Sequence, residues 1–399
     1  MRLALVVVVG VILYGSLFPF DFTAPPADVA AALSIGLTEV RRGDALANLL
    51  LYIPLGLLLV VGKREGRRGG RILAAVVLGF CLSLTVEVAQ LWLPPRITSL
   101  SDLALNTAGS FLGAVLGLAA ARVMPGRRDG ASRQNHEVGL YGLLLMLAFL
   151  GWQGAPFVPS IDWQAWKDSL KPLLTAASLS PSGMLAYVAA WLGVGLVAAG
   201  LVRPVLVAPL LAGLTLAVCA GKVLVISRVV TPEILLTGLA VATAWALAPT
   251  RKVVAAPGVV AAVLAVFIAW DGLAEAWAQR VPGGAPFHWI PFRGFLTGSM
   301  VVNVLAMFEK VFLYGTLVLA LLRMGAPALV VGSLAALLLL AVEGLQALTG
   351  GRTAEITDPL LAVILTALAV RLGEGRRSLV SSQPRQTPPA RGRVARDLL

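Results

Sequence analysis

Charged residues, cysteine and histidine are all scarce in this sequence. Asp, Glu, Lys and Arg together make up 13% of its 399 residues, about half the share of a typical soluble domain. Only Cys81 and Cys219 are present, both inside apolar runs, which excludes a disulfide scaffold and indicates small packing residues. His136 and His288 are predicted to lie on opposite sides of a membrane, so a shared metal site or a histidine relay is excluded. No phosphate-binding P-loop and no GxSxG motif occurs, and we therefore predict no catalytic residues, no metal, no cofactor and no enzymatic activity.

Apolar residues dominate the chain instead. They make up 58% of it, enough for about eleven or twelve membrane crossings at about 20 residues each. The sequence therefore predicts an all-α, polytopic bundle of about 12 transmembrane helices. The first apolar run follows Arg2 and lacks a small-residue cleavage site, so we interpret it as an anchor and not as a signal peptide. The candidate spans lie near residues 3–19, 45–61, 72–93, 102–121, 138–152, 183–202, 204–226, 232–248, 254–270, 299–322, 327–349 and 358–371.

The net charge of +12 does not indicate a nucleic-acid partner, because the Lys and Arg residues lie between the apolar runs. When alternate loops are grouped, one side of the membrane holds roughly twice as many Lys and Arg residues as the other. This bias predicts a multi-pass protein of the bacterial cytoplasmic membrane, with both termini cytoplasmic and membrane lipids as partners. The basic tail, residues 373–399, has too little apolar surface to fold alone and is predicted to be disordered.

One polar pattern occurs twice, 256 residues apart. The first copy is Glu87, Gln90, Arg96 and Asp102, and the second copy is Glu343, Gln346, Arg352 and Asp358. The spacings within the two copies are identical. Four matched polar residues in apolar surroundings indicate an internal repeat.

A weaker copy of the pattern lies between these two. Its polar loop contains Arg228, while Cys219 and Lys222 occupy the Glu and Gln positions. At the Asp position the chain has an isoleucine, and Glu233 lies one residue earlier. We interpret this region as a degenerate third copy.

Each copy begins with a Pro-containing segment, around Pro19, Pro159 and Pro291. The predicted modules are residues 1–137, 138–253 and 254–372, each with four spans. Because four spans return the chain to the side where it started, successive modules share one orientation and form a parallel repeat. The three loops that contain Arg96, Arg228 and Arg352 are therefore predicted to be external.

Two further motifs surround the polar pattern of the first module. They are Asn48-Leu-Leu-Leu-Tyr-Ile-Pro54-Leu-Gly56 and Asp102-Leu-Ala-Leu-Asn106-Thr-Ala-Gly109. With the Glu, Gln, Arg and Asp pattern, they resemble the VanZ-like family of bacterial membrane proteins over residues 14–121. The resemblance continues over residues 288–371, where Ala362 and Leu365 replace Asn106 and Gly109. It implies an envelope-related protein, since the namesake of the family is associated with low-level resistance to the glycopeptide teicoplanin.

The repeated polar residues allow three interpretations. Charges inside a membrane cost about 2.5 to 3.5 kcal/mol each, so each needs a partner or water. In the first interpretation they form a helix clamp, with Arg96 bridging Glu87 and Asp102. In the second they line an outward-facing pocket, together with Asn106, that binds a polar headgroup such as a lipid-linked cell-wall precursor. In the third, Glu87 and Glu343 are the proton-coupling carboxylates of a transporter or flippase.

Three further patterns predict packing. Lys310 is expected to pair with Glu343 or Glu309 across helices. Gly109, Gly113 and Gly117 recur every four residues, which predicts close helix packing within the chain. In the external segment 153–182, Trp163-Gln-Ala-Trp166 has helical spacing and predicts a helix along the membrane surface.

Overall fold

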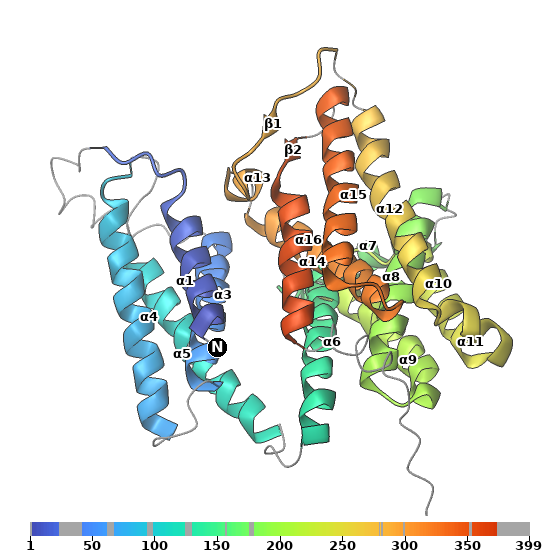
Figure 1. Ribbon diagram of the computed structural model, residues 1–399, viewed down its shortest axis with the longest axis horizontal. Coiled ribbons are helices and arrows are strands. Elements are labelled where there is room, and N and C mark those ends of the chain that lie inside the picture. Colours follow the sequence, from blue (N-terminus) through green and yellow to red (C-terminus); the bar gives the residue numbers. More distant parts are fainter. Residues whose placement is uncertain are drawn as a thin grey trace, which may run out of the picture. The chain divides into compact units, whose positions relative to one another are not determined.

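The computed structural model describes residues 2–23, 42–61, 68–93, 99–123, 130–155, 158–174, 179–278, 280, 282–297, 300–350 and 353–372 (Figure 1). Its helices are α1 (Arg2–Leu17), α3 (Arg42–Val61), α4 (Arg68–Gln90), α5 (Leu100–Val123), α6 (Gly130–Gly154), α7 (Trp163–Leu174), α8 (Pro181–Leu201), α9 (Pro204–Leu224), α10 (Pro232–Ala246), α11 (Ala248–Val254), α12 (Pro257–Ala278), α13 (Arg293–Thr297), α14 (Met300–Arg323), α15 (Ala328–Thr349) and α16 (Thr357–Arg371). Two short strands, β1 (Phe287–His288) and β2 (Ala354–Glu355), pair in parallel. The all-helical fold is therefore confirmed, and each of the twelve predicted apolar segments coincides with a helix.

Six helices in the described part of the chain are long and apolar enough to cross a membrane. They are Gly69–Gln90, Pro181–Leu201, Pro204–Leu224, Pro257–Ala278, Val302–Arg323 and Ala328–Thr349. On α4, the large apolar side chains of Leu73, Val77, Leu84 and Val88 are all exposed. Such a surface is too apolar for water and is typical of a helix that faces lipid. The protein is a membrane protein, while the full set of twelve spans remains a prediction.

The chain forms two compact units, which are described separately. The first unit comprises residues 1–128 and 294–304. Its closest helix pair is α3 with α5, where a Cβ atom on Gly109 would collide with the carbonyl oxygen of Leu49. A Cβ atom on Gly113 would collide with the carbonyl oxygen of Ile53 in the same way. The two glycines therefore let the backbones touch within one chain, as their spacing predicted.

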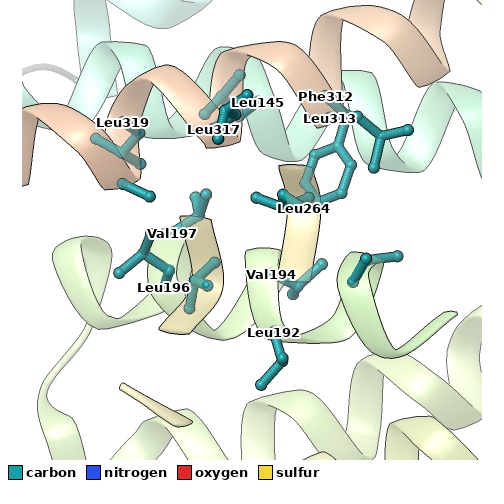
Figure 2. Close-up of a cluster of buried hydrophobic side chains, with 14 of the residues drawn as sticks. Leu145, Leu192, Val194, Leu196, Val197, Leu264, Phe312, Leu313, Leu317 and Leu319 are labelled. Carbon is teal, nitrogen blue, oxygen red and sulfur yellow. The ribbon is translucent and has the colours of Figure 1, made fainter. Parts of the chain in front are cut away.

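The second unit comprises residues 129–293 and 305–399, and α8 lies at its centre. All ten residues from Ala189 to Ala198 are buried, so α8 is covered on every side. Figure 2 shows Leu264 of α12 between Leu313 of α14 and Val194 of α8. On the other side of the core, α15 packs against both α12 and α16 (Figure 1).

The predicted helix at Trp163 and Trp166 is present as α7. The two indole rings lie 5.9 Å apart, and the Val230 amide, after α9, donates to the carbonyl of Ser169 at 2.9 Å. Asp168 faces solvent, and its hydrogen bond to Lys171 holds the pKa of the carboxyl below its usual value. Whether α7 lies along a membrane surface remains a prediction from its sequence.

Candidate functional site

The repeated glutamates bind matching backbone amides. Oε2 of Glu87, at the end of α4, accepts a hydrogen bond from the amide of Ser99 at 2.9 Å. Oε2 of Glu343, on α15, accepts from the amide of Glu355 at 2.7 Å. In both copies the donor lies 12 residues after the glutamate and just before the next helix. Each carboxylate thus ties the return loop to the helix before it, which leaves neither buried group unpaired.

The repeated glutamines also bind matching backbone groups. Nε2 of Gln90 donates to the carbonyl of Ser16 in α1 at 2.9 Å, and Nε2 of Gln346 donates to the carbonyl of Gly272 in α12 at 2.9 Å. The separation is 74 residues in both copies. Ser16 and Gly272 are thus also 256 residues apart, although neither belongs to the pattern from which the repeat was inferred. The correspondence between the two copies therefore extends to the partners of the pattern.

Two smaller features match as well. Ser99 and Ser101 hydrogen-bond through their hydroxyl groups, and the Thr357 hydroxyl donates to Glu355 Oε2 at 2.9 Å, again two residues away. Among the Pro-containing openings, the residues after Pro19 and Pro291 are Phe20 and Phe292. Both have left-handed backbones, with φ of 65° and 59°.

In the middle copy, arginine takes over the backbone contacts. Nε of Arg228 donates to the carbonyl of Ala155 at 2.7 Å, and Nη2 donates to that of Trp152 at 3.1 Å. These carbonyls lie at the end of α6, where helical partners are missing. Burial lowers the pKa of Arg228, and the negative charge of Glu309 opposes that shift. Arg228 thus holds the end of α6.

Lys222, at the glutamine position, makes a different contact. Its Nζ lies 3.4 Å from the hydroxyl of Tyr187 on α8 and 5.7 Å from the centre of that ring. Only 6% of the Lys222 side chain surface is exposed. An ammonium group at this position costs more to bury than an amide, so the middle copy departs from the other two in charge as well as in sequence.

The remaining predicted residues of the first copy lie close together. Asn106 on α5 is buried and donates from Nδ2 to Ser83 Oγ on α4 at 2.9 Å. Asp102 lies one turn earlier on α5, near enough to Glu87 for the two carboxylates to interact. Arg96 and Arg352, the proposed bridging residues, lie outside the described residues.

The last copy contains an ion pair between a partly exposed lysine and a buried aspartate. Nζ of Lys310 on α14 lies 2.6 Å from Oδ1 of Asp358 at the start of α16, and the hydroxyl of Tyr314 donates to Oδ2 of Asp358 at 2.6 Å. Lys310 was predicted to pair with Glu343 or Glu309, and that prediction was wrong. Because Lys310 and Tyr314 are one turn apart, they reach the two oxygens of the same carboxylate.

A cavity of about 110 Å³ opens beside this ion pair, among α12, α14, α15 and α16. The structure brings three of the predicted residues, Glu343, Gln346 and Asp358, to its wall. Glu343 is near enough to Asp358 and Lys310 to interact with both charges. The full set of polar residues at the wall is Asp271, Glu309, Lys310, Tyr314, Glu343, Gln346, Thr353 and Asp358.

Family comparison agrees with the motifs of the first module. Residues 3–121 match the model of the VanZ/LLP1 family. This segment is VanZ-like. The match includes all the described polar residues of the first copy, from Ser16 to Asn106. Neither the curated proteins nor the solved structures contain a match to the chain.

The VanZ/LLP1 family is generally non-enzymatic. Within the part of the chain that the structure describes, no group of three His, Cys, Asp or Glu side chains is arranged to hold a metal ion. What the segment contains is a set of polar side chains bound to backbone groups at helix ends. These side chains satisfy backbone groups that would otherwise lack a partner inside a membrane.

The sequence analysis did not identify three polar residues of the cavity wall, Asp271, Tyr314 and Thr353. Asp271 follows the predicted ninth span by one residue and was counted as loop, but α12 continues to Ala278. Tyr314 lies inside a continuous apolar run and gave no polar signal. A carboxylate at the end of an apolar run was the signal that could have identified Asp271.

Proposed function

We propose that this protein is a non-enzymatic VanZ-like protein of the bacterial inner membrane, with three parallel four-span modules and both termini cytoplasmic. In this proposal the repeated Glu and Gln residues clamp helices, and the cavity of the last module binds a polar headgroup from the outer face. The observation that carries it is the 110 Å³ cavity with the Lys310–Asp358 ion pair at its wall. Polar groups of this kind are costly in a membrane and mark functional positions by default.

The tandem repeat is supported by partners as well as by the pattern. The Glu-to-amide separation of 12 and the Gln-to-carbonyl separation of 74 both recur. Side chains that satisfy the same backbone groups in two copies favour the clamp interpretation for Glu87, Gln90, Glu343 and Gln346. Glu343 and Gln346 also line the cavity, so in the last copy the clamp residues are part of its wall.

The charge of the cavity indicates which headgroup it would take. Four carboxylate side chains, Asp271, Glu309, Glu343 and Asp358, line it with a single lysine. An excess of acidic side chains complements a headgroup that carries an ammonium group or hydroxyl donors. We therefore place an ammonium-bearing envelope lipid or precursor ahead of a ligand held through its phosphate.

An envelope phenotype tests this proposal. A bacterial strain without the native gene is complemented with wild type, Asp358→Asn or Asp102→Asn at matched membrane abundance, and its sensitivity to teicoplanin, vancomycin and detergent is scored. We expect Asp358→Asn to lose protection and Asp102→Asn to keep it. Equal protection by wild type and Asp358→Asn would rule out a role for the cavity.

The topology is tested separately. Alkaline phosphatase fused after residue 174 should be active, because the proposal places α7 outside the cytoplasm, while a fusion after residue 372 should be inactive. The opposite pattern would reverse the proposed orientation and the side to which the cavity opens.

A proton-coupled transporter or flippase is the second candidate. The observation that favours it is the closeness of two carboxylates, Glu343 and Asp358, to one ammonium group at the edge of a membrane span. Such a group of charges can exchange a proton as the environment changes. Glu343→Gln should abolish proton-coupled transport in vesicles and leave folding intact. Unchanged transport with both Glu343→Gln and Glu87→Gln would eliminate this candidate.

A further inference from the structure

A second cavity lies on three of the four helices that form the first, α12, α14 and α15. It has a volume of about 250 Å³ and is lined by residues of α12, α14 and α15 that are all apolar. It occupies the part of these helices toward Pro257, Arg323 and Ala328, whereas the polar cavity lies toward Ala278, Met300 and Thr349. One set of helices thus carries a polar cavity at one end and an apolar cavity at the other.

The two cavities share a single face of each helix. On α15 the lining residues are Leu334 and Leu338 in the apolar cavity, then Val342 and Gln346 in the polar cavity. Residues four apart lie above one another on a helix, so these four side chains form one row. The two cavities therefore lie one after the other along the same helix faces, and we call these faces with both cavities the furrow.

The same row occurs on the neighbouring helix. On α14, Lys310 in the polar cavity is followed at intervals of three or four by Leu313, Leu317 and Leu321, the last two in the apolar cavity. Figure 2 shows the side chains of Leu313 and Leu317 on this helix. At about 1.5 Å per residue, the row from Leu334 to Gln346 is about 18 Å long, similar to one leaflet of a bilayer core of about 30 Å.

We propose that the furrow binds one lipid with an ammonium-bearing headgroup, whose hydrocarbon chain lies in the apolar cavity while its headgroup lies in the polar cavity. This rests on the proposed headgroup site and names its ligand as a membrane lipid and not a soluble amine. The acidic side chains complement the headgroup, and the apolar lining complements a chain. The apolar lining also lets the end of the lipid's hydrocarbon chain pass into the surrounding bilayer without contacting polar side chains.

Native mass spectrometry of the full chain in detergent tests the proposal. The probes are dioleoylphosphatidylethanolamine, dioleoylphosphatidylglycerol and glycerophosphoethanolamine, which has the same headgroup without chains. Because burial of the hydrocarbon chain stabilises the complex, we expect the first lipid to bind at least about tenfold more tightly than the chain-free compound. It should also bind at least about tenfold more tightly than the phosphatidylglycerol, which lacks the ammonium group.

Two substitutions on α12 separate the furrow from the lipid surface. Ala265 lines the apolar cavity, and its neighbour Val266 is 58% exposed outside it. Ala265→Trp should weaken phosphatidylethanolamine binding about tenfold and leave glycerophosphoethanolamine binding unchanged. Val266→Trp adds the same side chain on the adjoining face, and should change neither.

The outcomes distinguish this inference from the proposed function. Glu343→Gln should weaken the lipid and its chain-free headgroup to the same extent, because both use the polar cavity. Suppose that Glu343→Gln weakens both ligands but Ala265→Trp and Val266→Trp bind phosphatidylethanolamine equally well. The headgroup site is then supported, and the proposal that the hydrocarbon chain lies in the apolar cavity is overturned. If Glu343→Gln changes neither ligand, the headgroup site itself fails. Equal binding of phosphatidylglycerol and phosphatidylethanolamine overturns the ammonium class of ligand.

Discussion

The first and last modules use the same side chains for their framework and different ones for their charges. Glu87 and Glu343 both bind an amide 12 residues later, and Gln90 and Gln346 both bind a carbonyl 74 residues earlier. Only α14 adds a lysine to the cluster, because α3 has no Lys or Arg after Arg42. The recurring glutamates and glutamines bind matching backbone groups in both modules. In the last module Glu343, Gln346 and Asp358 also line the cavity, where Lys310 adds the ion pair.

The largest difference in stability between the two modules is expected when Asp358 or its counterpart Asp102 is removed. Asp358→Ala leaves Lys310 and Tyr314 without their carboxylate, and we expect a loss of about 3 kcal/mol in the free energy of unfolding, at the low end for a buried pair since Lys310 is partly exposed. Asp102→Ala, its counterpart, should lose less than half of this. Thermal unfolding in detergent measures both. Restoration of stability in Lys310→Met/Asp358→Ala would confirm that an uncompensated charge causes the loss, and equal losses in the two modules would contradict the difference between them.

Removal of Glu87 or Glu343 tests whether the two glutamates contribute equally to the stability of their modules. Glu87→Ala and Glu343→Ala each leave a backbone amide without its acceptor, for an expected cost of about 1 to 3 kcal/mol. Glu87→Gln and Glu343→Gln keep an acceptor oxygen and should retain most of the stability. The unfolding midpoints of the four variants should form two matching pairs. A large effect in one module alone would show that the two glutamates are not equivalent.

Substitution of Gly272, whose carbonyl accepts from Gln346, should cause an intermediate loss of stability. A Cβ atom on Gly272 would collide with Val342, so Gly272→Ala should cost about 1 to 3 kcal/mol through overpacking. The matching residue Ser16 already has a side chain, and Ser16→Ala should change stability by less than about 0.5 kcal/mol. The ratio of the two losses, measured by thermal unfolding, shows how tightly each copy is packed. Tolerance of Gly272→Ala would mean that α12 and α15 can separate without cost.

The smallest effect is expected in the middle module. Lys222→Gln restores the residue that both other copies have, and it removes the charge of a residue that is only 6% exposed. Because the lost contact with Tyr187 is long and the burial cost of the charge disappears, stability should stay within about 1 kcal/mol of wild type or rise. Lys222→Met, of similar length but without hydrogen-bonding groups, is the control. A clear loss with both variants would assign the lysine a structural role.

Much of the framework could be predicted from the sequence. Helix positions follow from apolar runs and their length, which are local properties, so all twelve predicted segments lie on helices. The Glu, Gln and Asp positions of the two copies were recognised from spacing alone. Spacing cannot identify a partner, so the Ser99 amide bound by Glu87 and the Ser16 carbonyl bound by Gln90 were not predicted. The clamp through Arg96, which lies outside the described residues, stays a prediction.

The class of protein, its helices and its matched polar positions could all be inferred from the sequence. Hydropathy and residue spacing depend only on the order of residues and not on how the helices pack. Only the tertiary structure decided which charges meet. Lys310 reaches Asp358 and not Glu343 or Glu309, and Asp271 joins the cavity from a third helix. These contacts depend on the rotation of each helix about its axis and on the helices beside it, and packing between distant segments sets both.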